Sequence, residues 1–166
     1  MTPTIQNILV PTDFSAASER AIDYARVLSV RLGASIHLVH VLDRLLSSEM
    51  AWAAPAREAA AYYERQYQEA RAMLGSLAAT LEKDHVSATA EVRTGAAATE
   101  IIKAAVDYGA DLIVMATHGR TGLSHLVLGS VAEHVIRHAR CPVLAMRDNQ
   151  PESGSVSAAE VAENLA

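Results

Sequence analysis

The chain of 166 residues has few residues that could form disulfide bonds or an aromatic core. It contains one cysteine, one tryptophan and one phenylalanine, and 4 % of its residues are aromatic. A single cysteine, Cys141, excludes an intramolecular disulfide and is typical of a reducing compartment. Half of the residues are nevertheless apolar, with alanine the most prominent among them. This composition favours one domain in which helices pack closely on a sheet.

The chain also lacks an excess of positive charge, a long apolar run and a leader-like start. Its net charge is −5, and lysine and arginine form no cluster, which argues against a nucleic-acid partner. No apolar run approaches the length that spans a bilayer, so no membrane partner is expected. Residues 1–7 lack a basic region followed by an apolar stretch, so a secretory signal is not expected either. We therefore expect a cytoplasmic protein.

The most informative stretch is residues 116–133, which follows the apolar run 112–115 and ends in a helical pattern beginning at Ser130. A strand, a glycine-bearing loop and a helix N-terminus expose backbone N–H groups to an anion. This arrangement predicts a phosphate-binding loop. Ser130 and Glu133 also match a helix capping box, which needs no ligand. The capping box leaves Gly119 and Gly129 unexplained, so both interpretations stay open.

Strand and helix patterns alternate along the chain. Apolar runs predict strands over residues 5–10, 35–42, 86–92, 111–117 and 142–146. Helical spacing predicts helices between Ser15 and Gly33, over residues 56–81, from Ala98 to Gly109 and over residues 130–138. This order indicates an α/β domain with a parallel sheet and helices on both faces, over residues 1–147. The polar composition of residues 148–166 predicts a mobile C-terminal tail.

Two loops with turn chemistry lie at the carboxyl ends of predicted strands: residues 11–15 and 118–129. Ligands of parallel sheets bind beyond these ends, where the strand order reverses. If the first and fourth strands are neighbours, the two loops face each other across one crevice. Asp13 then lies where it can accept hydrogen bonds from a ribose. A buried or helix-capping aspartate is the alternative use of that residue, and it stays open.

Three segments together resemble the universal stress protein family: PTDFS at 11–15, VHV at 39–41 and ATHGRTGLSHLVLGSVAEHVIRHARCPVLAMR at 116–147. The resemblance covers residues 5–147 and implies a Rossmann-like, adenine nucleotide alpha hydrolase-like sheet of strand order 3-2-1-4-5. ATP-binding members of that family carry G-x2-G-x9-G-[S/T] after the fourth strand. Here Gly119 is the second glycine and Gly129-Ser130 closes the pattern, whereas Ala116 replaces the first glycine.

The resemblance implies that the chain binds ATP or another adenine nucleotide, with or without Mg²⁺. Asp13 would contact adenosine, and the backbone of Val41 would hold the adenine edge. The implied phosphate neighbours are Gly119, Gly129, Ser130 and Val131, and the implied pocket walls are Pro11, Thr12 and Met115. The methyl group of Ala116 would crowd the nucleotide slightly. His118 and Arg120 either approach the phosphates or face solvent, and both positions stay open.

Other reactive side chains point to weaker hypotheses. His134 and His138 are four residues apart on a helix and could share a metal, but a third ligand is missing, so no metal site is expected. Cys141 precedes a buried strand and is better explained as a small core residue than as a nucleophile. The loop holds no lysine and no carboxylate placed to activate water. We therefore expect no catalytic residues.

The predicted function is a nucleotide-responsive stress or signalling module that is not an enzyme. The alternatives are a slow ATPase or phosphotransferase on the same pocket, and a nucleotide-free member that acts by protein association. Residues 142–146 would form a sheet edge in the order 3-2-1-4-5, and an apolar edge strand tends to pair. The resemblance points the same way, so a homodimer through this strand is expected.

Overall fold

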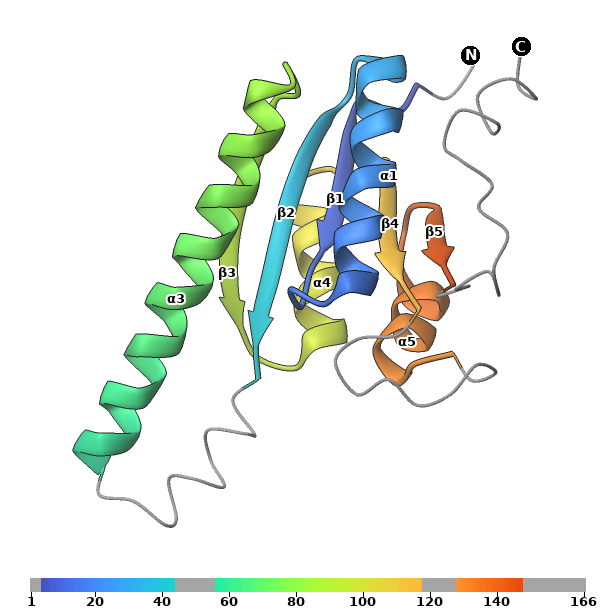
Figure 1. Cartoon of the computed structure of the whole chain (residues 1–166). Helices are drawn as coiled ribbons and strands as arrows, with labels where there is room; N and C mark the ends of the chain where they lie inside the picture. The colour runs from blue at the N-terminus through green and yellow to red at the C-terminus, as the bar shows by residue number, and fades with distance from the viewer. Residues whose placement is uncertain (1–3, 44–55, 118–127, 148–166) are drawn as a thin grey trace, which may run out of the picture.

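A five-stranded parallel sheet of order β3-β2-β1-β4-β5 forms the centre of the molecule (Figure 1). The computed structural model describes residues 4–43, 56–117 and 128–147. The α/β class that the sequence pattern predicts and the strand order that the family resemblance implies are both confirmed. The elements in chain order are β1 (Asn7–Pro11), α1 (Ala16–Leu32), β2 (Ser35–Leu42), α3 (Ala56–Lys83), β3 (Ala88–Thr94), α4 (Ala97–Asp107), β4 (Leu112–Ala116), α5 (Ser130–His138) and β5 (Val143–Met146).

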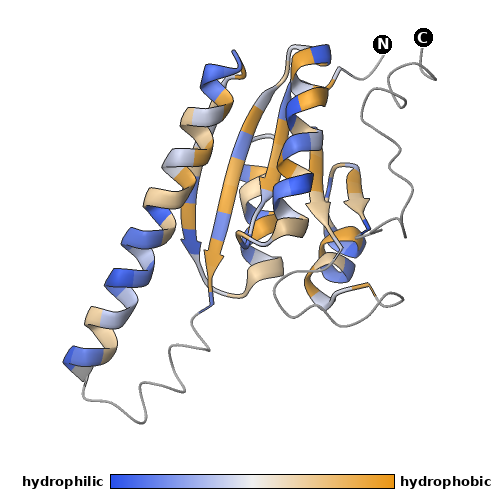
Figure 2. Cartoon of the chain, viewed as in Figure 1, coloured by the Kyte–Doolittle hydropathy of each residue, from blue (hydrophilic) through white to orange (hydrophobic). Residues whose placement is uncertain are grey.

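Of the described helices, α1 and α3 cover one face of the sheet and α4 and α5 cover the other (Figure 1). Ile8 and Val10 of β1 pack into the cluster of α1 and α3, whereas Leu9 between them packs into the cluster of α4 and α5. Successive side chains of a strand point to opposite faces, so a strand buried on both sides must be apolar throughout. Figure 2 shows hydrophobic colouring along most of β1, β2 and β4, interrupted in β2 by hydrophilic bands.

The first helix begins and ends where the sequence predicts. Ser15 is the N-cap, and its side chain accepts a hydrogen bond from the backbone N–H of Ser18 at 3.3 Å. Gly33 ends α1 with φ 68°, in the left-handed region that a glycine enters without steric cost. A side-chain N-cap of this kind stabilises a helix by about 1 kcal/mol. Local sequence therefore determines both ends of α1.

The long helix α3 corrects one expectation, because its apolar stripe is fully buried only in its second half. Ala70, Leu74 and Leu81 are buried, whereas Ala60 in the first turns is exposed. At 1.5 Å per residue the 28 residues of α3 extend about 42 Å. The eight residues of β2 extend only about 26 Å. The first turns of α3 therefore run past the strand ends, as Figure 1 shows.

The third strand begins two residues later than the sequence indicates. Val86 is buried, but its N–H group donates to the carbonyl of Leu81 at 3.1 Å and so belongs to the turn that ends α3. His85 occupies the left-handed region in that turn, with φ 61°. An apolar side chain alone does not distinguish such a buried turn from a strand. The first strand is similarly shifted, from residues 5–10 to Asn7–Pro11.

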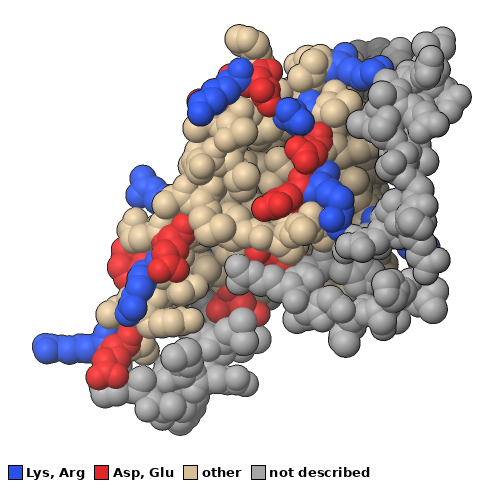
Figure 3. Space-filling model, in the orientation of Figure 1, with Lys and Arg blue, Asp and Glu red and all other residues tan. Residues whose placement is uncertain are grey.

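The surface over α1 and α3 carries charges of both signs. Arg26 on α1 pairs with Asp84 after α3 at 2.7 Å, which is typical of this mixed pattern. Figure 3 shows acidic and basic side chains interspersed over the described part of this face. No described helix is both long enough and apolar enough to cross a membrane. Residues 148–166, for which the sequence predicts a tail, lie outside the described residues.

Candidate functional site

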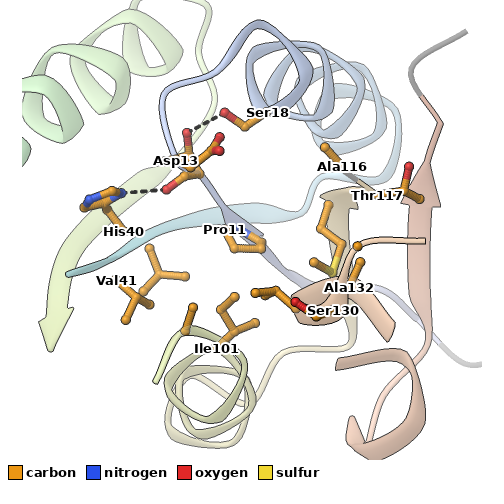
Figure 4. Close-up of a pocket in the computed structure, with 16 residues that line it drawn as sticks. Pro11, Asp13, Ser18, His40, Val41, Ile101, Ala116, Thr117, Ser130 and Ala132 are labelled. Carbon is orange, nitrogen blue, oxygen red and sulfur yellow. Dashed lines mark hydrogen bonds between the residues drawn. The ribbon is translucent and has the colours of Figure 1, made fainter. Parts of the chain in front are cut away.

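A cavity of about 320 Å³ opens at the carboxyl ends of β1, β2 and β4, beside the first turns of α4 and α5 (Figure 4). This is the point where the strand order reverses, since β1 lies between β2 and β4. The volume is within the range of small-molecule sites. The cavity brings together all the predicted site residues that the structure describes: Pro11, Thr12, Asp13, Val41, Met115, Ala116, Gly129, Ser130 and Val131.

The turn after β1 is held by its own side chains. Asp13 Oδ1 accepts hydrogen bonds from the backbone N–H of Ser15 at 3.1 Å and from its hydroxyl at 2.5 Å. Thr12 Oγ1 accepts from the N–H of Phe14 at 3.0 Å and lies 3.0 Å from the Ser18 hydroxyl. The N-cap of α1 is therefore Ser15, and Asp13 orients the side chain of Ser15. Oδ1 of Asp13 therefore has a local structural role in the turn. Asp13 also lines the cavity, so its carboxylate can still contact a ligand there.

Phe14 marks the turn as strained, because its φ of 62° is in the left-handed region. A bulky residue enters this region only where its surroundings enforce it, and such residues cluster at functional sites. His40 supplies part of that enforcement. Its ring centroid lies 4.5 Å from that of Phe14, and its Nδ1 lies 2.7 Å from the carbonyl oxygen of Thr12. A carbonyl only accepts, so His40 Nδ1 carries the proton and fastens the turn to β2.

His40 is a cavity residue that the sequence analysis missed. His37 and His40 are three residues apart in β2, so their side chains point to opposite faces of the sheet. His40 contacts Phe14, whereas His37 stacks on Tyr108 on the other face of the sheet. The sequence position of His40 could have identified it, because His40 precedes Val41 at the end of a strand that reaches the cavity. Ala97 and Ile101 of α4 were missed in the same way and also line the cavity.

The backbone of Val41 lies beyond the end of β1. Within a strand, the N–H and C=O groups of one residue point to one side and those of the next residue to the other. The carbonyl of Val39 accepts from Thr12 N at 2.9 Å, whereas that of Leu42 accepts from Gly95 N at 3.0 Å on the β3 side. Val41 therefore points its backbone groups to the same side as Val39. Because β1 ends at Pro11, opposite Val39, these groups face the cavity.

The N-terminus of α5 forms the opposite wall. Gly129 is the N-cap, and the first intrahelical bond runs from Glu133 N to Gly129 O at 2.9 Å. The N–H groups of Ser130, Val131 and Ala132 precede that bond, so they have no acceptor within the helix. All three residues line the cavity. The helix dipole adds positive potential at this end, and the arrangement suits an anion.

The capping-box interpretation of Ser130 is wrong. Ser130 is the first residue of α5, and the carboxylate of Glu133 pairs with Arg137 at 2.9 Å. The N–H of Gly129 donates to the carbonyl of Thr117 at 2.9 Å, so Gly129 joins the two ends of the preceding loop. The N–H group of Gly129 is therefore not available to a ligand. Gly129 contributes to the cavity only by having no side chain that would occupy it. His118, Gly119 and Arg120 lie outside the described residues.

The remaining reactive groups do not extend this site. Cys141 is half-buried and packs against the cluster of α4 and α5, and burial raises the pKa of its thiol. A thiol held protonated is a poor nucleophile, which supports the structural role. In the three described ranges, no group of three or more histidine, cysteine, aspartate or glutamate side chains could hold a metal ion.

Comparison with known proteins agrees with this geometry. The universal stress protein MJ0531 of Methanocaldococcus jannaschii is 33 % identical over 151 residues, covering 89 % of this chain and 85 % of that protein. The solved structure of the M. jannaschii protein MJ0577 matches with a TM-score of 0.78 at 28 % identity, over 88 % of this chain and 98 % of the other.

A more distant solved structure, the universal stress protein of Archaeoglobus fulgidus in complex with dAMP, shares the fold. It matches with a TM-score of 0.59 at 21 % identity, over 86 % of this chain and 98 % of the other. The model of the universal stress protein family matches residues 4–147, which include every described strand and helix. This chain therefore belongs to the universal stress protein family.

Proposed function

We propose that this protein binds an adenine nucleotide, ATP with or without Mg²⁺, and acts as a nucleotide-responsive stress or signalling module in the cytoplasm. The observation that carries the proposal is the cavity itself, which joins a carboxylate, a strand edge and a helix N-terminus from three distant segments. These are the three recognition elements that a ribose, an adenine and a phosphate need. The dAMP complex of the A. fulgidus relative supports this class of ligand.

In the proposed complex the ligand lies along the cavity from β2 to α5. The backbone of Val41 receives the adenine edge, and Asp13 accepts from the ribose. The N–H groups of Ser130 and Val131 hold phosphate oxygens, and Gly129 lets them approach. Gly119, His118 and Arg120 belong to the proposed phosphate side. The walls are formed by Pro11, Thr12, Met115 and Ala116.

The same cavity supports binding without efficient turnover. Among the described lining residues, Asp13 is the only carboxylate, and none is a lysine or an arginine. Phosphoryl transfer requires a metal held by placed carboxylates, a positioned water and a cation on the γ-phosphate. Helix N–H groups stabilise phosphate charge in the ground state as well as in the transition state. Such equal stabilisation does not lower the activation barrier for phosphoryl transfer. We therefore propose a binding protein, with a slow ATPase or phosphotransferase as the second candidate.

The deciding experiment identifies the ligand and then measures turnover. Mass spectrometry of small molecules released from freshly purified protein should detect an adenine nucleotide, and calorimetry should show ATP binding. Steady-state assays with Mg²⁺ should give turnover far below the enzyme median of about 10 per second. Turnover near that value would favour the enzyme. Protein that purifies empty and ignores ATP, ADP and AMP would leave protein association as the function.

The homodimer is proposed through β5, which is the edge strand beside β4. Val143 packs into the core cluster of α4 and α5, whereas Ala145 is half-buried and belongs to neither core cluster. Ala145→Lys therefore places a charge on the edge strand with little damage to the core, and it should convert dimers to monomers. Light scattering coupled to size exclusion measures this.

The matched control for the dimer is Thr99→Lys, which adds the same charge at an exposed position of α4. It should leave the mass unchanged. A wild-type protein that is monomeric at micromolar concentration would contradict the proposed dimer.

A further inference from the structure

Two histidines on α5 form a feature that nucleotide binding does not use. His134 and His138 lie one helical turn apart and are both exposed. Their ring centroids are 4.2 Å apart, and the ring planes are inclined by only 25°. Residues four apart on a helix are surface neighbours, so one small ligand can touch both imidazoles. The sequence raises this pair as a metal site and discounts it because no third ligand is near.

A hydrogen bond of His138, which the sequence spacing alone does not predict, supports a metal site. His138 Nδ1 lies 2.8 Å from the carbonyl oxygen of His134. Because a carbonyl only accepts, the proton of the neutral ring is on Nδ1, and the lone pair is on Nε2. Metal-binding histidines almost always donate their other ring N–H to such a carbonyl or to a carboxylate, which fixes the tautomer and ring orientation. His138 is thus held in the form that a metal ion requires.

The charged neighbours do not block the pair. The nearest cation along the helix is Arg137, and its guanidinium pairs with Glu133 at 2.9 Å. At 100° per residue, Glu133 lies about 100° from His134 and 140° from His138 around the helix axis. The ion pair therefore draws the guanidinium toward the other flank of α5. Favourable interaction of histidines with a helix C-terminus explains their residue type and the bond from His138 Nδ1 to a last-turn carbonyl, but not the close, nearly parallel approach of the second ring.

We propose that His134 and His138 form a solvent-open, two-ligand site for a divalent late transition metal, with Cu²⁺ bound in preference to Zn²⁺. Imidazole nitrogens suit both ions, and the affinity order of first-row metals favours copper. Zn²⁺ sites generally use three or four protein ligands, whereas tetragonal Cu²⁺ accepts two nitrogens with water in the remaining positions. The lack of a third protein ligand therefore disfavours Zn²⁺ but not Cu²⁺.

The site would brace the helix that begins at the cavity. Val131, which lines the cavity, precedes His134 by three residues and His138 by seven, so the three lie on one flank of α5. A bridging metal ties the last two turns of α5 together across that flank. This site does not depend on the proposed nucleotide, and it can be tested without one.

The test titrates Cu²⁺ alone into the full untagged chain, followed by calorimetry and by electron paramagnetic resonance. The expected spectrum is that of tetragonal Cu²⁺ with two nitrogen ligands. His134→Gln and His138→Gln should each weaken binding at least about tenfold, since even outer-shell partners of metal ligands contribute 10- to 100-fold. Both residues are exposed, so circular dichroism should show an unchanged fold.

The matched control keeps the number of histidines at seven and moves one of them, and Glu133→Gln is its reference because both variants lose the ion pair with Arg137. Glu133→His combined with His134→Gln moves one imidazole by a single residue, so that the pair is five apart and about 140° apart around the helix. This double variant should bind as weakly as the single variants. Wild-type affinity in this variant, or in both single variants, would place the bound copper on other histidines and overturn the proposal.

Discussion

Gly129→Asn is expected to abolish nucleotide binding without destabilising the protein. Gly129 is the N-cap of α5 with φ −62° and ψ 145°, an extended conformation open to any residue. Asparagine is among the best N-cap residues, so the helix should not lose stability. Its side-chain carbonyl would accept from the N–H group of Val131, one of the two donors proposed for phosphate, or from that of Ala132 beside it. The variant therefore supplies an internal competitor and also fills the space beside the ligand.

Calorimetry should show a loss of ATP affinity of at least about 100-fold, equivalent to about 2.7 kcal/mol. Ser130→Ala is the matched control, because it removes a hydroxyl at the next position and keeps every backbone N–H group. It should weaken binding by less than about tenfold. Thermal unfolding should find Gly129→Asn at least as stable as the wild type. Undiminished ATP affinity in Gly129→Asn would mean that the phosphates do not lie at the α5 N-terminus.

Acid is expected to destabilise the fold through His37. This side chain points from β2 toward α4, is 7 % exposed and stacks on Tyr108 with ring centroids 3.3 Å apart. Nδ1 lies 2.5 Å from the hydroxyl of Thr89, and Nε2 is buried without a partner among the described residues. Burial lowers the pKa of His37 from 6.5 to about 4; Glu91 nearby opposes the shift and Arg93 adds to it.

The direction of the effect follows from proton binding. Below pH 6.5 the unfolded chain takes up a proton at His37 that the folded protein still excludes, so stability falls as the pH falls. The loss begins near pH 6.5, reaches about 2 kcal/mol at pH 5 and levels off near 3 kcal/mol below pH 4. Above about pH 7.5 the ring is neutral in both states, and His37 contributes no pH dependence.

Urea unfolding between pH 7 and pH 4 measures this loss in the wild type and in His37→Phe. Phenylalanine keeps an aromatic ring over Tyr108 and has no proton to bind. The carboxylates of the chain titrate in both proteins, so the difference between the two pH profiles isolates His37. The variant should lose about 2 kcal/mol less than the wild type between pH 7 and pH 5. Parallel profiles would show that His37 is hydrated or protonated in the folded protein.

The positions of helices and strands could be predicted from sequence wherever the signal is local. α1 lies between Ser15 and Gly33 as expected, and α5 spans the predicted residues. Where packing decided the outcome, the sequence was less informative. Val86 is as apolar as a strand residue, yet it packs in the turn after α3, and Ala60 continues a core stripe beyond the sheet that would bury it.

The candidate site shows the same division. Glycine spacing and turn residues indicated which two loops matter, and the predicted residues that the structure describes share one cavity. The hydrogen-bond partners within that cavity were not predictable. His40 reaches the carbonyl of Thr12, 28 residues away, and the N–H of Gly129 bonds to Thr117 rather than facing the ligand.

By itself, the sequence determined the α/β class, the caps of α1, the family resemblance and the stretches that carry the site. Each of these depends on residues within a few positions of one another, where periodicity and turn chemistry act. Only the tertiary structure decided which backbone N–H groups remain available at α5, how Val41 faces the cavity and where His37 is buried. These depend on strand register and on where a neighbouring strand ends, which are set by contacts between residues far apart in the chain.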